Sequence, residues 1–170
     1  MTDIDYSIEI DGLDKLHAQA KRIGEYDTIV TDEFTFAMNQ SVMTLVGAIK
    51  PLTPIYRGTL RQSIDSEVKQ QGVGDIIGRV GSTLKSEEYP AVMEFGRTPG
   101  AAMPPIDALE RWGHLKLGVD GLGFILARSI AAKGIKGKRF MKRGYDASKR
   151  AIGGFFDKAK ERIVNRLVIK

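Results

Sequence analysis

The side chains that most often carry chemistry are few in this sequence and lie far apart. The chain of 170 residues has no cysteine and two histidines, His17 and His114, which fall in separate predicted helices without metal-ligand spacing around them. Adjacent acids such as Asp32 and Glu33 point apart on a helix or loop, so they do not form an acid–base pair. The sequence therefore predicts no catalytic residue, no cofactor and no metal site, and we expect a protein that is not an enzyme.

One glycine-rich stretch, GVDGLG at 118–123, could suggest a phosphate-binding loop. It follows a predicted helix rather than a strand, and no Lys-Ser or Lys-Thr pair comes after it, so we interpret it as a turn between helices. The sequence also contains no nucleophile-elbow or zinc-protease motif. Binding or structural roles are therefore favoured over catalysis.

The charges are divided between the two parts of the chain. Residues 1–110 carry 10 Lys and Arg against 17 Asp and Glu, a net charge of −7, whereas residues 111–170 carry 16 against 4, a net charge of +12. Such parts attract one another, within a subunit or between copies, and the basic part could also face a polyanion. A solvated helical surface is the plainer interpretation of the same charges.

Composition indicates a folded chain made in the cytoplasm. Apolar residues make up 42% of the sequence, which is too much for a disordered chain and enough for one core. No apolar run approaches the roughly 18 residues that a membrane span needs. The acidic, alternating first ten residues do not resemble a signal peptide.

The elements that would position any site are predicted from periodicity. A short strand is expected at 5–10 and a helix at 13–23, followed by a long helix at 28–49 with apolar residues every three or four positions. Pro51 and Pro54 should prevent this long helix from continuing. The first half of the chain therefore has a long helix as its main element.

A β-hairpin is predicted next, over about 59–81. Its first strand, 59–68, alternates apolar and polar residues, and the second follows a turn and begins at Ile76. The alternating stretch 89–95 predicts a third short strand, which Pro90 places at an edge. The expected fold class is α+β, with a small antiparallel sheet packed against the long helix.

The last third is predicted to be helical and basic. Pro104 and Pro105 should open a helix with Ile106, Leu109, Trp112 and Leu117 on its apolar side, which Gly118 ends. Asp120 should cap a second helix that ends at Gly134, and a final helix is expected at about 145–168. The Gly153–Gly154 pair in that helix predicts close packing or a bend. We divide the chain into an α+β core, 1–103, and a helical extension, 104–170, in the same domain or as an appendage.

Two motifs, PIYRGTLRQSI at 54–64 and YPAVMEFGR at 89–97, have a structural explanation. Gly58 can take a positive φ and turn the chain from the long helix into the hairpin, with Leu60 and Ile64 anchored in the core. In the second motif, Phe95 is expected to be an anchor and Gly96 a turn. Both motifs are therefore predicted to form joints of the fold without catalysis.

The same motifs resemble those of the tail-completion, or head–tail neck, proteins of long-tailed bacteriophages. The likeness covers about residues 10–165 and includes the basic segment that ends in an aromatic residue before the last helix. It is carried by the following matching positions: Pro54, Gly58, Leu60, Arg61, Ser63, Ile64, Tyr89, Glu94, Phe95 and Gly96. The resemblance implies a structural virion protein that finishes the proximal end of the tail and allows it to join the DNA-filled head.

The resemblance also implies partners and a location. Such proteins form closed rings, here expected to have six copies, and contact neighbouring neck and tail proteins: the stopper or connector, the tail terminator and the tail tube. The expected location is the virion neck, assembled in the host bacterial cytoplasm, with no membrane partner. DNA passing through the channel is a further candidate partner. The alternatives are a tail terminator of the same neck and a free basic DNA-binding protein.

The basic segment before the last helix is predicted to be an exposed, adaptable arm that contacts a neighbouring subunit. Its glycines argue against a rigid buried helix. Phe140 and Met141 would supply apolar anchors, which favours a protein groove over DNA. The candidate assembly contacts are Lys136, Lys138, Arg139, Phe140, Lys142 and Arg143.

Overall fold

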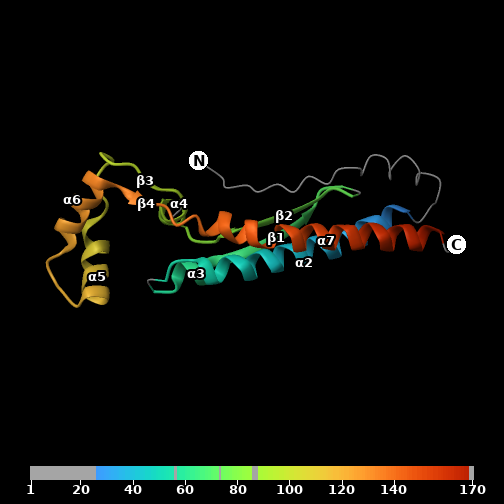
Figure 1. Ribbon diagram of the computed structural model, residues 1–170, viewed down its shortest axis with the longest axis horizontal. Coiled ribbons are helices and arrows are strands. Elements are labelled where there is room, and N and C mark those ends of the chain that lie inside the picture. The colour runs from blue at the N-terminus through green and yellow to red at the C-terminus, as the bar shows by residue number, and fades with distance from the viewer. Residues whose placement is uncertain (1–25, 56, 73, 86–87, 169–170) are drawn as a thin grey trace.

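The computed structural model describes residues 26–55, 57–72, 74–85 and 88–168 and has an elongated shape (Figure 1). The strand predicted at 5–10 and the helix predicted at 13–23 lie outside these residues. Two long helices, α2 (Tyr26–Leu52) and α7 (Phe140–Val168), lie side by side and run in opposite directions. They form the main body of the molecule.

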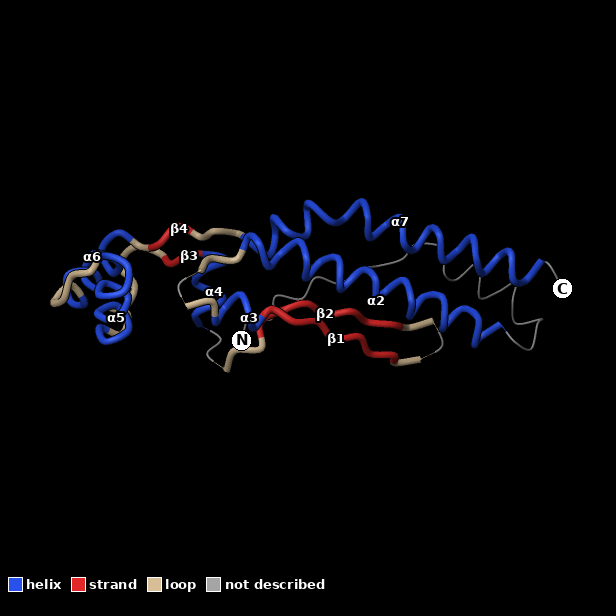
Figure 2. The backbone as a smooth tube through the Cα atoms, turned by 90° about the horizontal axis from the view of Figure 1, so that it is seen from below, coloured by secondary structure: helices blue, strands red, loops and turns tan. Residues whose placement is uncertain are grey.

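A β-hairpin also packs on α2, and in the view of Figure 2 α2 lies between α7 and the hairpin. Strands β1 (Ile64–Gln70) and β2 (Ile76–Ser82) pair antiparallel, with Ile64 opposite Ser82 and Gln70 opposite Ile76. At Gly78 the second strand passes so close to α2 that an added Cβ would lie 2.5 Å from Met38 Sδ. The predicted α+β fold with a hairpin packed on a long helix is confirmed.

The core lies between these layers. In α2 the buried side chains recur along one broad face, as the predicted apolar stripe requires, and α7 faces them with its own stripe. The Phe34 and Phe156 rings meet across the two helices with centroids 6.2 Å apart. The principal buried apolar residues are Tyr26, Val30, Phe34, Met38, Val42, Leu45, Ile49, Leu60, Ile64, Phe140, Met141, Ile152, Phe156 and Ile163.

Helix α2 continues three residues beyond the predicted end. Pro51 lies in its last turn, and Thr53 closes the helix because both its backbone N–H (3.1 Å) and its hydroxyl (3.0 Å) donate to the Ile49 carbonyl. In the part of the chain that the structure describes, no helix combines the length and the apolar character needed to cross a bilayer.

Two stretches predicted as strand are helical. The residues before β1 form a short helix, α3 (Thr59–Ser63), and the stretch predicted as a third strand is helix α4 (Glu88–Phe95). Pro90 lies in the first turn of α4, where its missing N–H costs nothing. The alternation of apolar residues at 89–95 was therefore misleading over so short a segment.

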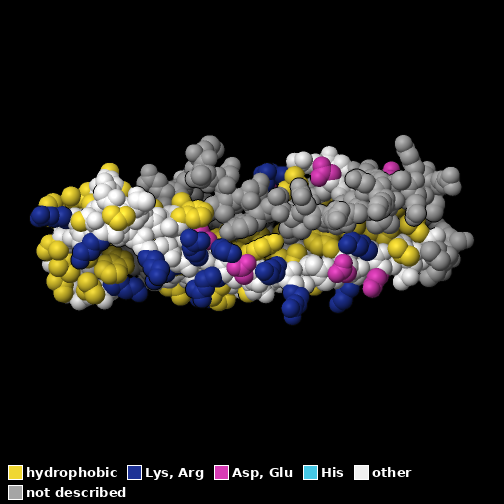
Figure 3. All heavy atoms as spheres, turned by 45° about the horizontal axis from the view of Figure 1, so that its top comes forward, with side chains coloured by type: hydrophobic (Ala, Val, Ile, Leu, Met, Phe, Trp, Pro, Cys, Tyr) yellow, Lys and Arg dark blue, Asp and Glu magenta, His cyan; other side chains and the backbone are white. Residues whose placement is uncertain are grey.

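A second helical pair stands at one end of the molecule (Figure 1). Helix α5 (Ile106–Leu117) starts after Pro105 and ends at Gly118, as predicted, and α6 (Gly123–Lys133) ends at Gly134. Two chain segments join this pair to the body through a two-residue ladder between β3 (Gly96–Arg97) and β4 (Ile135–Lys136). Figure 3 shows hydrophobic side chains crowding the surface at this end.

The expected helical extension, 104–170, divides into two parts that differ in their packing. Helix α7 contributes to the core with α2, whereas α5 and α6 stand apart. The last helix also begins at Phe140, five residues before the predicted start. Neither Gly153 nor Gly154 has a described atom within 4 Å of an added Cβ, so among the described residues the close packing predicted there is not found.

Candidate functional site

The side chains with catalytic potential do not gather into a site among the described residues. No group of three potential metal ligands occurs in residues 26–55, 57–72, 74–85 and 88–168. His114 is exposed, with its Nδ1 atom 2.7 Å from Asp120 Oδ1, and His17 lies outside the described residues. Asp120 therefore contacts His114 and does not cap α6 as predicted.

The first motif forms the joint between α2 and the hairpin. Gly58 has φ +79°, as predicted, and its carbonyl accepts a 2.8 Å bond from the Gln62 N–H in the single turn of α3. Leu60 and Ile64 are buried, while the Ser63 hydroxyl lies 2.8 Å from the Ser82 hydroxyl and ties the start of β1 to the end of β2. Two other matching residues, Pro54 and Arg61, are not part of the core.

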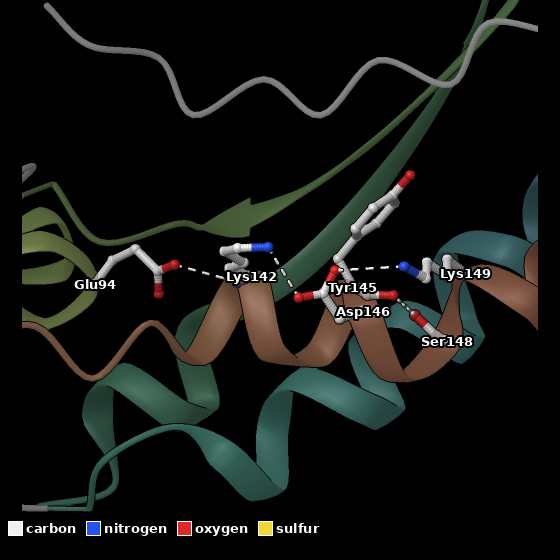
Figure 4. A network of polar contacts seen from close by, with 6 residues as sticks. All are labelled: Glu94, Lys142, Tyr145, Asp146, Ser148 and Lys149. Carbon is white, nitrogen blue, oxygen red and sulfur yellow. Dashed lines mark hydrogen bonds and ion pairs between the residues drawn. The ribbon is translucent and has the colours of Figure 1, made fainter.

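In the second motif, Glu94 caps a helix that lies far away in the sequence. Its side chain is 1% exposed, and its two carboxylate oxygens accept the backbone N–H groups of Met141 (2.8 Å) and Lys142 (3.1 Å), as Figure 4 shows for Lys142. Helix α7 has no acidic residue in its own first turn. Glu94 thus supplies the negative charge and the acceptors that a helix start requires.

Two close backbone approaches fix Glu94 opposite α7. Gly96 has φ +86°, and an added Cβ would lie 2.2 Å from the Ile135 carbonyl oxygen. At Gly137 an added Cβ would lie 2.4 Å from the Glu94 carbonyl oxygen. The Glu94 carbonyl also accepts a 3.0 Å bond from the Arg139 N–H. Gly96 was predicted to form a turn; it has a positive φ but is the first residue of β3, directly after α4, and it lies against the segment before α7.

The aromatic residues of the second motif do not anchor it. Phe95 is 58% exposed and Tyr89 is 37% exposed. The prediction that Phe95 is a core anchor is therefore wrong, because residues 88–95 form a helix and not an alternating strand. The residue of α4 that is buried and contacts the start of α7 is the polar residue Glu94.

The basic segment does not form an adaptable arm. Phe140 is 1% exposed and Met141 is 5% exposed, and both pack in the core at the start of α7. The predicted role of Phe140 as an assembly anchor is wrong, because Glu94 lets the helix begin early enough to turn Phe140 inward. The structure leaves the other candidate contacts exposed: Lys136, Lys138, Arg139, Lys142 and Arg143.

The first turns of α7 also lie against the end of α2. An added Cβ on Gly144 would lie 2.4 Å from Ile49 Cγ1 and 3.0 Å from Ile49 Cα. At the opposite end of the pair, Glu33 is buried and accepts from Arg162 Nε (2.5 Å) and from Arg166 (3.1 Å). Close backbone contact therefore holds one end of the pair and a buried carboxylate holds the other.

The α5–α6 pair is held together differently. Its buried residues are small, namely Gly113, Gly123 and Ala127. The Glu110 carboxylate accepts the N–H groups of Gly121 and Gly123, so Glu110 takes the capping role that was predicted for Asp120. The fully buried residues of the pair are thus small, Glu110 adds a polar cap, and the half-buried Leu122 and Leu126 lie against Gly113.

Large apolar side chains of this pair face outward. Ile106 and Leu117, which were predicted to lie on the apolar side of α5, are both exposed. Leu115, on the opposite side of the same helix, is exposed as well. The exposed set on the pair is Ile106, Leu115, Leu117, Val119, Phe124 and Ile125. Exposed large apolar side chains gathered on one small part of a molecule are typical of an interaction site.

Sequence reasoning missed the residues that carry these contacts. Glu94 was noticed only as a matching motif position, and Glu33, Glu110 and Gly144 were not assigned any role. Their partners lie on other elements, so no local spacing points to them. Leu115 could have been found, because its position opposite the predicted apolar side gives α5 a second apolar face.

Comparison of the chain with models of known families, with curated proteins and with solved structures finds no match.

Proposed function

We propose that this chain is a structural subunit of a bacteriophage neck, a tail-completion protein that forms a ring at the proximal end of the tail. The resemblance of its two motifs to that family motivates the proposal. The observation that carries it is the α5–α6 pair, which projects from the body and exposes large apolar side chains. The role is structural, and its partners are other copies of the chain and neighbouring neck proteins.

The packing of α5 and α6 supports a subunit that is completed by another copy. Phe124 and Ile125 are 54% and 62% exposed, and the buried residues between the two helices are glycine and alanine. Short helices without a packed apolar face are marginal in water. An apolar surface on such a pair gains most when a partner covers it.

A second apolar surface on the same chain could receive this pair. On α2, Phe36 (52% exposed) and Met43 (71% exposed) lie seven residues apart, which places them on one face of the helix. Gly47 continues that face, and no described atom lies within 4 Å of its added Cβ. Two different patches on one chain are what a head-to-tail ring requires.

The charge distribution favours the same arrangement. Residues 1–110, net −7, and residues 111–170, net +12, attract each other within one chain, where Glu33 contacts Arg162 and Arg166, and the same attraction would act between neighbouring copies. Charge pairs at the rim of such an interface set orientation and association rate more than affinity.

The proposal is tested by mass measurement and by particle assembly. Light scattering of the purified chain, alone and with tails that lack it, should reveal a ring or ring formation on the tail. The variant Phe124→Ser with Ile125→Ser should reduce ring formation at least tenfold, because it removes apolar area from the interface. A matched variant, Ser129→Ala on the exposed part of α6, should assemble like the parent.

A chain that stays monomeric and never joins tails would overturn the proposal. Electron microscopy of completed particles separates tail completion from the tail-terminator alternative, because each neck ring has its own position along the axis.

A further inference from the structure

The exposed surface where β4 leads into α7 is strongly basic. Residues 136–150 carry seven Lys and Arg against one acid, Asp146, a net charge of +6. All seven basic side chains are exposed, and Figure 3 shows Lys and Arg gathered along this part of the molecule. We name them the cationic strip: Lys136, Lys138, Arg139, Lys142, Arg143, Lys149 and Arg150.

Little of this charge is neutralised within the described chain. Asp146 contacts two members of the strip, Lys142 at 2.9 Å and Lys149 at 4.0 Å (Figure 4). Among the residues whose side chains the structure describes, five members make no ion pair: Lys136, Lys138, Arg139, Arg143 and Arg150. The strip therefore offers cations that a polyanion can use.

The burial of Phe140 and Met141 decides which kind of partner fits. A protein groove is usually bound through apolar or aromatic anchors at the centre of the contact. Phe140 and Met141 point into the core and Tyr145 is half-buried, so the exposed side chains of residues 136–150 are the seven cations, Asp146 and Ala147. A phosphate backbone needs only the cations.

The strip is also rigid and long enough for several phosphates. Helix α7 starts at a defined residue because Glu94 caps it, and the rise from Arg139 to Arg150 is about 16 Å. Phosphates of one DNA strand follow one another every ~3.4 Å along the helix axis, so about five fall within that length. Since Glu94 occupies two N–H groups of the first turn, contact is made by side chains.

We propose that the cationic strip binds the phosphate backbone of duplex DNA without reading its sequence. This inference depends on the charge and burial of the strip and goes beyond the proposed ring, since a single copy already presents the surface. In a neck ring the natural ligand would be the DNA that passes from head to tail.

Fluorescence anisotropy with a short labelled duplex tests the inference over a series of salt concentrations. The variant Lys138→Gln, Arg143→Gln, Arg150→Gln should weaken binding about tenfold or more at low salt. It should also make the slope of log affinity against log salt shallower by about 2 to 3, since each lost phosphate contact removes ~0.9. Two unrelated duplex sequences should bind equally.

A matched control removes the same charge elsewhere. Arg111→Gln, Lys116→Gln, Arg128→Gln changes three exposed cations of the α5–α6 pair and should alter affinity less than about twofold. Asp146→Asn removes the acid within the strip and should tighten binding about two- to threefold. All replaced residues are exposed, so each variant should melt with the parent.

The inference is overturned if the parent does not bind duplex, or if the two triple variants lose affinity equally. It is also overturned if the strip variant binds duplex as tightly as the parent but fails to enter particles, because an acidic protein surface is then the partner. Light scattering of the same samples keeps the two proposals apart: DNA binding without rings contradicts only the ring, and rings without DNA binding contradict only the strip.

Discussion

The α2–α7 pair and the α5–α6 pair are both packed pairs of helices in one chain, but they are stabilised in different ways. The first buries aromatic and branched side chains along its length, with Glu33 buried at one end and Glu94 of α4 capping α7 at the other. The second buries glycine and alanine and exposes Phe124 and Ile125. Under the function we propose, the chain separates folding, which α2 and α7 carry, from assembly, for which the exposed α5–α6 pair is available.

Among substitutions at the ends of the α2–α7 pair, the largest effect is expected from a single methyl group at the contact of the two helices. Gly144→Ala should lower the free energy of unfolding by about 2–4 kcal/mol, because its Cβ would collide with the side chain and backbone of Ile49. Gly153→Ala, in the same helix but with open space around it among the described residues, should raise it by about 0.5–1 kcal/mol. Urea denaturation of both variants measures the difference, and equal stability of the two would contradict the close contact.

A somewhat smaller loss is expected at the cap of α7. Glu94→Ala leaves two buried N–H groups without acceptors and should cost about 2–3 kcal/mol, whereas Glu94→Gln keeps one acceptor oxygen and should cost less. Thermal melts followed by circular dichroism rank the three proteins. If Ala and Gln are indistinguishable from the parent, the carboxylate does not stabilise the start of α7.

A third prediction concerns hydrogen exchange in the two pairs. In the unassembled chain, backbone amides of α5 and α6 should exchange faster than those of α2 and α7, because the smaller pair has no large fully buried apolar side chain among its described residues. Protection of α5 and α6 should rise on assembly. Equal protection of both pairs in the free chain would show that α5 and α6 are packed as stably as α2 and α7.

Phe124→Ser should change the free energy of unfolding by less than about 0.5 kcal/mol, since its side chain is 54% exposed. The same substitution at Phe156, which packs on Phe34, should cost about 3–5 kcal/mol. A large loss at Phe124 would mean that the smaller pair contributes to the stability of the free chain.

The smallest effect is expected on the pH dependence of stability at low pH. The hydrogen bond from Lys142 lowers the pKa of Asp146 below 3.8, aided by the charges of Lys142 and Lys149, while burial opposes the shift. A carboxyl group whose pKa is lower in the folded state stabilises that state above its unfolded pKa. This contribution is lost as the pH falls through the pKa of the folded state. Because Asp146 is exposed, Asp146→Asn should leave the pH dependence of the melting temperature nearly unchanged. A marked change below pH 4 would show that the contact is stronger than its exposure suggests.

Local patterns were sufficient where one segment contains all the relevant chemistry. The apolar stripe predicted α2, Pro105 and Gly118 predicted the limits of α5, and the need for a positive φ predicted the conformation of Gly58. The hairpin and the α+β class followed from the same kind of evidence. Each depends on residues within a few positions of one another, so periodicity and turn chemistry determine them.

Tertiary structure decided what the two motifs do. Glu94 and the N–H of Met141 are 47 positions apart, and only the fold brings the carboxylate to the start of α7. That cap lets α7 begin at Phe140, which buries an aromatic residue that the sequence pattern placed on the surface and leaves a strip of cations exposed. The reason is physical: a sequence shows which side chains are apolar or charged, whereas the packing of distant elements determines which of them water reaches.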